Sequence, residues 1–128
     1  MVRLALGLLL LAGGGATAHA WTCPGTASEP YEPRTFLGYA CADDCRRHKA
    51  GFAWAERHRV TDAAACDGLE LLQAEGCRAF VEEGARPEAA GDRWATENEI
   101  ADRCLCDGAG ARFRAGCLRA VAAPTSTY

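Results

Sequence analysis

Residues 50–81 read AGFAWAERHRVTDAAACDGLELLQAEGCRAFV, and residues 90–121 read AGDRWATENEIADRCLCDGAGARFRAGCLRAV. At a shift of 40 and without a gap, the two stretches share the pattern A-G-x-x-W-A-x4-[VI]-x-D-x3-C-D-G-x7-G-C. The pattern includes two of the three tryptophans and four of the eight cysteines, so chance does not explain it. We therefore predict a duplicated helical hairpin.

Each copy divides into two helices joined by a turn. The first helix carries the tryptophan and ends near residue 59 or 98. Asp62 or Asp102 then caps a short helical turn by accepting a hydrogen bond from a backbone N–H. The second helix is predicted over residues 69–83 and 110–122. Because the sequence has no alternating apolar runs, strands are not expected, and the predicted fold class is all-α with about four helices.

Residues 1–20 have the three parts of a secretory signal peptide. Arg3 provides the positive charge, an apolar run follows it, and Ala18-His19-Ala20 provides the small-residue cleavage motif. The mature protein is therefore predicted to begin at Trp21, and the apolar run is too short to cross a bilayer. We expect an exported protein, secreted or periplasmic, with no membrane span.

The mature chain divides into an arm and a domain. Residues 21–38 contain three prolines and two glycines without a sustained period, which predicts an extended N-terminal arm. Residues 39–128 form the predicted disulfide-rich helical domain. Cys23 is expected to tie the arm to this domain.

The cysteine count predicts that disulfides hold the fold together. Eight cysteines follow the signal peptide, and an even number in a small exported chain is typical of a disulfide framework. Four bridges can be paired in about 105 ways, so spacing by itself does not set the connectivity. We expect every one of them to be bridged: Cys23, Cys41, Cys45, Cys66, Cys77, Cys104, Cys106 and Cys117.

Helix geometry narrows the choice for one cysteine. A helix rises about 1.5 Å per residue, so a chain that folds back near residue 62 brings position 77 level with about position 47. Cys77 is therefore predicted to pair with Cys45, or otherwise with Cys41. Cys66 and Cys77 are expected to be poor partners, because a helical segment between them would hold their Cα atoms more than about 7 Å apart.

A stripe of chemically active side chains raises a second interpretation. Cys41, Cys45, His48 and Phe52 recur at helical spacing, and Cys77 could approach them from the next helix. Three cysteines and one histidine could hold zinc or copper. The competing interpretation is that the cysteines are bridged and His48 is a packed polar residue with a backbone partner. An oxidising compartment favours the bridged form, because thiols there are normally consumed as disulfides.

Two further pairs of residues have structural explanations. Cys104-Leu105-Cys106 could be a redox centre, but Cys106 is a repeat position, which favours ordinary structural bridges. Asp43 and Asp44 could be an acid–base dyad, but acidic residues ahead of a helix stabilise the positive end of its dipole. We expect both aspartates to act as capping residues.

The aromatic residues of the repeat are expected to serve the core. Trp54 and Trp94 occupy equivalent positions, so each is predicted to fill the centre of its own hairpin, with a ligand platform as the alternative. His58 is expected to be solvated.

The first copy and the residues before it resemble a known pattern. Residues 39–56 read YACADDCRRHKAGFAWAE, and residues 75–80 read EGCRAF. These stretches resemble the pattern Y-x-C-x-x-D-C-x-x-H-x-A-G-[YF]-x-W-A-E, closed by E-G-C-x-A-[YF], of a group of small exported bacterial proteins of uncharacterised function. The chain departs from it at Arg46-Arg47, where Ser-Gly is usual, and around Gln73, where a Ser-rich segment is usual. The resemblance implies export and a cysteine framework, and it adds no catalytic residue.

Composition argues against several classes of function. The chain of 128 residues has a formal charge of −3, which removal of Arg3 makes more negative, so there is no basic excess to bind nucleic acid. The two serines lie outside any G-x-S-x-G motif, and there is no P-loop or H-E-x-x-H motif. Lys49 follows His48 where secreted phospholipases A2 need a calcium-binding aspartate. We predict no catalytic residue and no cofactor.

The sequence thus predicts an exported, disulfide-stabilised helical protein that acts without catalysis. It would work by binding a protein partner, or as a structural or protective partner itself. One alternative is a metal-binding protein that uses the Cys/His stripe. The other is a periplasmic immunity-type inhibitor of a toxin.

Overall fold

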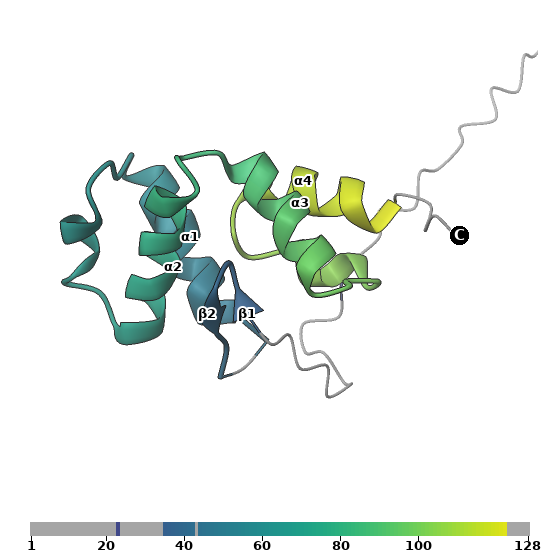
Figure 1. The fold of residues 1–128 in the computed structure, drawn as a ribbon, viewed down its shortest axis with the longest axis horizontal. Coiled ribbons are helices and arrows are strands. Elements are labelled where there is room, and N and C mark those ends of the chain that lie inside the picture. The colour runs from purple at the N-terminus through teal and green to yellow at the C-terminus, as the bar shows by residue number, and fades with distance from the viewer. Residues whose placement is uncertain (1–22, 24–34, 43, 123–128) are drawn as a thin grey trace, which may run out of the picture.

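The structure is a computed structural model that describes residue 23, residues 35–42 and residues 44–122. The predicted signal peptide and most of the predicted arm lie outside these residues. Two short strands precede four helices, which confirms the all-α fold class (Figure 1). The elements in chain order are β1 (Thr35–Phe36), β2 (Tyr39–Ala40), α1 (Arg46–Arg57), the 3-10 helix η1 (Ala63–Cys66), α2 (Leu71–Glu82), α3 (Pro87–Glu97), the 3-10 helix η2 (Arg103–Cys106) and α4 (Ala111–Ala122).

The two halves of the chain run through the same elements in the same order. Helix α1 packs against α2 and α3 against α4, and each pair is joined through a 3-10 helix (Figure 1). Asp62 caps η1 by accepting a hydrogen bond from the Ala64 N–H at 2.9 Å, and Asp102 caps η2 through the Cys104 N–H at 2.9 Å. Both predicted caps are therefore confirmed.

Glycine allows α1 and α2 to lie close together. A Cβ atom on Gly51 would lie 2.6 Å from the carbonyl carbon of Gln73 and closer still to its oxygen. A Cβ on Gly76 would lie 2.6 Å from the carbonyl carbon of His48. Because two backbones meet here, neither position can accept a side chain without moving a helix.

The second hairpin has the same close contacts at positions 40 residues later. A Cβ on Gly91 would lie 2.9 Å from the carbonyl carbon of Phe113, and one on Gly116 would lie 2.7 Å from that of Glu88. The shared A-G and G-C steps of the sequence pattern therefore mark the crossing of two helices in each half.

Two strands correct the expectation that the chain has none. Strands β1 and β2 form an antiparallel hairpin that pairs Thr35 with Ala40 and Phe36 with Tyr39. The turn between them has positive φ at Leu37 and at a glycine. A strand of two residues is too short to show an alternating pattern, which is why the sequence did not reveal it.

Phe36 joins the two halves, although the sequence assigned it to the arm. Its side chain is fully buried. The ring centroid lies 5.8 Å from that of Phe52, 5.7 Å from that of Phe113 and 6.3 Å from that of Trp94, so it contacts both hairpins. The Phe52 and Phe113 rings also meet directly at 5.3 Å. The end of the predicted arm is therefore part of the core.

Every cysteine is bridged, as predicted. Two bridges have the same separation of 11 residues, one in each hairpin. A third joins the predicted arm to the second hairpin, and the fourth closes a short loop ahead of α1. The pairs are Cys66–Cys77, Cys106–Cys117, Cys23–Cys104 and Cys41–Cys45.

The predicted bridge from Cys77 to Cys45 or Cys41 is wrong. Cys77 pairs with Cys66, and their Cα atoms lie 5.7 Å apart. The prediction assumed that most of the segment between them was helical, but η1 ends at Cys66 and α2 begins at Leu71. The chain reverses between these points, which brings Cys66 beside the second turn of α2.

In the described part of the chain, no helix combines the length and the apolar character required to cross a membrane.

Candidate functional site

The predicted Cys/His stripe does not form on one helix. Helix α1 begins at Arg46, so Cys41 and Cys45 precede it and bridge each other with a Cα–Cα distance of 5.1 Å. Cys77 is bridged elsewhere, so none of the three sulfurs is available as a thiolate ligand. Among the described residues, no group of three histidine, cysteine or acidic side chains could hold a metal ion. The described residues therefore do not form the Cys/His metal site that the stripe suggested.

His48 is a packed polar residue, as the competing interpretation predicted. Its side chain is fully buried, and Nε2 lies 2.6 Å from Oε2 of Glu75 on α2. The partner is thus a side chain and not the expected backbone group. Nδ1 is buried without a hydrogen-bond partner. A histidine paired with a carboxylate can act as a base, but this ring has no exposed surface with which to meet a substrate.

Tyr39 and Glu82 form a second polar pair near His48. The Tyr39 hydroxyl donates a hydrogen bond of 2.7 Å to Oε1 of Glu82, and the Tyr39 and His48 rings lie 6.5 Å apart. Partial burial and the hydrogen bond to the Glu82 carboxylate raise the pKa of Tyr39 to about 12. The charged tyrosinate is disfavoured next to a negative carboxylate.

This pair gives a testable pH dependence. Between the usual tyrosine pKa of about 10 and the raised pKa of Tyr39, the unfolded chain has released a proton that the folded protein still holds. Stability is therefore expected to fall as pH rises through this window. Ultraviolet titration should show one late-titrating tyrosine that is lost in Tyr39→Phe. In Glu82→Gln it should titrate earlier, and an unchanged late titration there would contradict the assignment.

Lys49 is buried, which its sequence context did not predict. Its side chain is 4% exposed. Nζ donates to the backbone oxygen of Leu105 and lies 4.4 Å from the centre of the Trp94 ring, in a cation–π contact. A lysine in an amphipathic helix is usually solvated, so its burial depends on the second hairpin covering it.

The remaining sequence candidates have structural roles. Cys104 and Cys106 bond to different partners, so they do not form one redox pair. Asp44 accepts hydrogen bonds from the Arg46 backbone N–H at 3.2 Å and from its Nε at 2.8 Å. Burial would raise the pKa of Asp44, but these bonds lower it below its usual value. Asp44 therefore stabilises the start of α1, and Asp43 lies outside the described residues.

The two repeat tryptophans differ in burial. Trp94 is fully buried, as predicted. Trp54 is only half-buried, and its ring stacks on that of His58 at 4.2 Å. The prediction that both fill a core is wrong for Trp54, because β1 and Lys49 of the first hairpin cover Trp94, and nothing equivalent in the described chain covers Trp54. His58 is exposed, as expected.

An arginine-lined cavity lies on the second hairpin. Its volume is about 360 Å³, and three arginines and one glutamate are among the residues that line it. Arg119 lies 3.5 Å from Glu88, and Arg86 Nε donates to the main-chain oxygen of Glu83 at 3.4 Å. Among the described residues, neither Arg86 nor Arg112 pairs with a carboxylate. The lining residues are Arg86, Glu88, Ala89, Arg112 and Arg119, which we call the arginine cavity. This cavity was not predicted from the sequence, although Arg112 and Arg119 are seven residues apart on a predicted helix, a spacing that places them on one face.

Comparison with protein-family models, with curated proteins and with solved structures gives no match to this chain. The resemblance of residues 39–80 to small exported bacterial proteins therefore stays a prediction. The geometry of the described residues is the basis for a functional proposal.

Proposed function

We propose that this protein is exported, is held rigid by its disulfides and acts by binding an acidic protein partner at the arginine cavity. The observation that carries the proposal is the excess of three guanidinium groups over one carboxylate in a single cavity. That excess is local, because the whole chain has more acidic than basic residues.

The disulfides support the export part of the proposal. All eight cysteines are bridged, and such bonds persist in oxidising compartments, where thiol-reducing systems are absent. Residues 1–20 have the pattern of a secretory signal peptide, which also supports export. The matching elements and close glycine contacts of the two halves favour an origin by duplication of one disulfide-bonded hairpin.

The chemistry of the cavity favours carboxylate groups as ligands. An arginine guanidinium can donate two parallel hydrogen bonds to a carboxylate, which gives directional as well as electrostatic recognition. The cavity lies where α3 begins, at Pro87, so the positive end of that helix adds to the field. The Cys106–Cys117 bridge fixes α4, which carries Arg112 and Arg119.

A capped hexaglutamate peptide labelled with a dye tests the proposal by fluorescence anisotropy. The Arg86→Gln/Arg112→Gln protein is expected to bind it about 2- to 30-fold more weakly, since each of the two exposed charge contacts contributes about 0.2–1 kcal/mol. Added salt should weaken binding by the parent.

Arg57→Gln is the matched control, because Arg57 is exposed and lies on α1, away from the cavity. This variant should bind like the parent. Equal loss in the control and the double variant would assign binding to general charge and would overturn the proposal. So would the absence of any saturable binding by the parent.

A further inference from the structure

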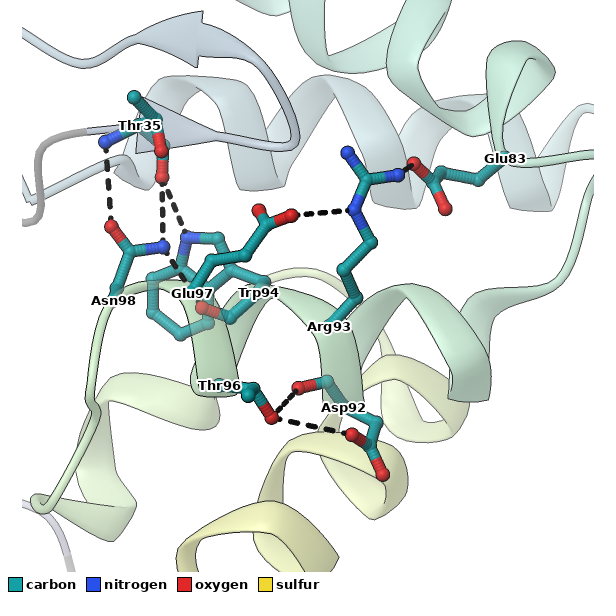
Figure 2. A network of polar contacts seen from close by, with 8 residues as sticks. All are labelled: Thr35, Glu83, Asp92, Arg93, Trp94, Thr96, Glu97 and Asn98. Carbon is teal, nitrogen blue, oxygen red and sulfur yellow. Dashed lines mark hydrogen bonds and ion pairs between the residues drawn. The ribbon is translucent and has the colours of Figure 1, made fainter.

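The end of α3 shows how this fold holds an extended backbone. Trp94 Nε1 and Asn98 Nδ2 each donate a hydrogen bond of 3.1 Å to the main-chain oxygen of Thr35 in β1. Asn98 Oδ1 accepts from the Thr35 N–H at 3.4 Å. The main-chain N–H and C=O of Thr35 are thus both bound by the side chains of Trp94 and Asn98, four positions apart (Figure 2).

The same framework ends α1, 40 residues earlier. The His58 N–H bonds to the Trp54 carbonyl at 3.0 Å, and the Asn98 N–H bonds to the Trp94 carbonyl at 3.1 Å. The side chains repeat the contact, with His58 Nδ1 and Asn98 Nδ2 each 2.8 Å from the respective tryptophan oxygen. The next residue, 59 or 99, has a positive φ of 50° or 52°. The main-chain hydrogen bonds and dihedral angles therefore hold the Trp54–His58 pair and the Trp94–Asn98 pair in the same way.

The two ends differ in what covers them. Trp94 is fully buried and Asn98 is 6% exposed beneath β1, whereas Trp54 is half-buried and His58 is exposed. Among the described residues, neither Trp54 Nε1 nor His58 Nε2 has a hydrogen-bond partner. Because His58 Nδ1 faces a carbonyl oxygen, it carries the proton, and Nε2 of the neutral ring is an acceptor.

We propose that Trp54 and His58 form a docking site for an extended polypeptide segment of a partner protein. The Trp54 indole N–H would donate to a main-chain oxygen of that segment, and His58 Nε2 would accept its N–H. These are the two groups that Trp94 and Asn98 satisfy on Thr35. Recognition of the main chain is typical of domains that bind extended peptides. The site lies on the first hairpin, away from the arginine cavity, and does not depend on it.

The probe is the capped peptide PRTFLG, residues 33–38 of this chain, because the equivalent pair binds its Thr35. Titrating it into the ¹⁵N-labelled full-length protein should shift the Trp54 indole signal in a saturable way and leave the Trp94 signal unchanged. Anisotropy of a dye-labelled probe should show about 3- to 10-fold weaker binding to Trp54→Phe and to His58→Ala, since each loses one hydrogen bond.

Two controls separate main-chain docking from simple hydrophobic contact. His58→Asn copies the second hairpin and should retain binding. A probe methylated on the Thr35 nitrogen lacks the N–H and should bind about 3- to 10-fold more weakly. Equal binding of the methylated probe or of Trp54→Phe, or no shift of the Trp54 signal, would overturn the proposal. A shift on Trp94, or one caused by concentrating the protein alone, would instead indicate strand exchange or self-association and would also overturn it.

Discussion

Replacing Gly76 by alanine is expected to destabilise the protein by about 3 kcal/mol or more, because the added methyl group would overlap the backbone of His48. The contact joins two main chains, so no side chain can rotate away and α1 and α2 must separate. A domain of this size has only about 5–15 kcal/mol of stability. Thermal unfolding by circular dichroism, with disulfides intact, should show a Tm lower by about 12 °C or more.

Gly68→Ala is the matched control for this substitution. A Cβ at Gly68 would meet nothing within 4 Å, and its φ is not in the left-handed region. It should melt within a few degrees of the parent, or slightly higher through reduced entropy of the unfolded chain. Gly116→Ala should behave like Gly76→Ala, because it meets the backbone of Glu88 in the second hairpin. If Gly76→Ala melts like Gly68→Ala, that result would contradict the close contact between Gly76 and the His48 backbone.

Replacing Phe36 by alanine should cost about 3–5 kcal/mol, the usual range for a buried aromatic residue in a core. The ring contacts Phe52 in the first hairpin and Phe113 and Trp94 in the second, so its removal leaves a cavity between the two halves. Denaturant unfolding is the measurement. The denaturant concentration at the midpoint should fall sharply. Two unfolding transitions in place of one would indicate that the two halves then unfold separately.

Leu71→Ala provides the control for loss of a large apolar side chain. Leu71 is 65% exposed at the start of α2, so its truncation should change stability by less than about 0.5 kcal/mol. Similar midpoints for the two variants would show that residues 35–38 are an arm after all and do not belong to the core.

Much of the local structure followed from spacing along the chain. The helical hairpins, the Asp62 and Asp102 caps and the complete pairing of cysteines depend on residues near one another or on composition, and all were predicted. The boundaries of the second helices were off by one or two residues, because the chain needs a turn after each Cys-Asp-Gly before α2 and α4 begin.

The sites were less predictable, because their members are distant in the sequence. His48 was expected to be a packed polar residue, but its partner Glu75 is 27 positions away and has no signature of its own. Lys49 is buried only because η2 of the other hairpin covers it. The arginine cavity combines the start of α3 with one face of α4, and no single motif contains both.

The two tryptophans separate local from long-range causes most clearly. Their identical A-G-x-x-W-A settings give the same helix and the same bonded end, because those features depend on neighbouring residues. Their burial differs, because β1 and the first hairpin pack over Trp94, while nothing in the described chain takes that place over Trp54. Repeat periodicity therefore predicts which elements form. Which of two equal faces is covered, and which cysteine meets which, depends on how those elements pack.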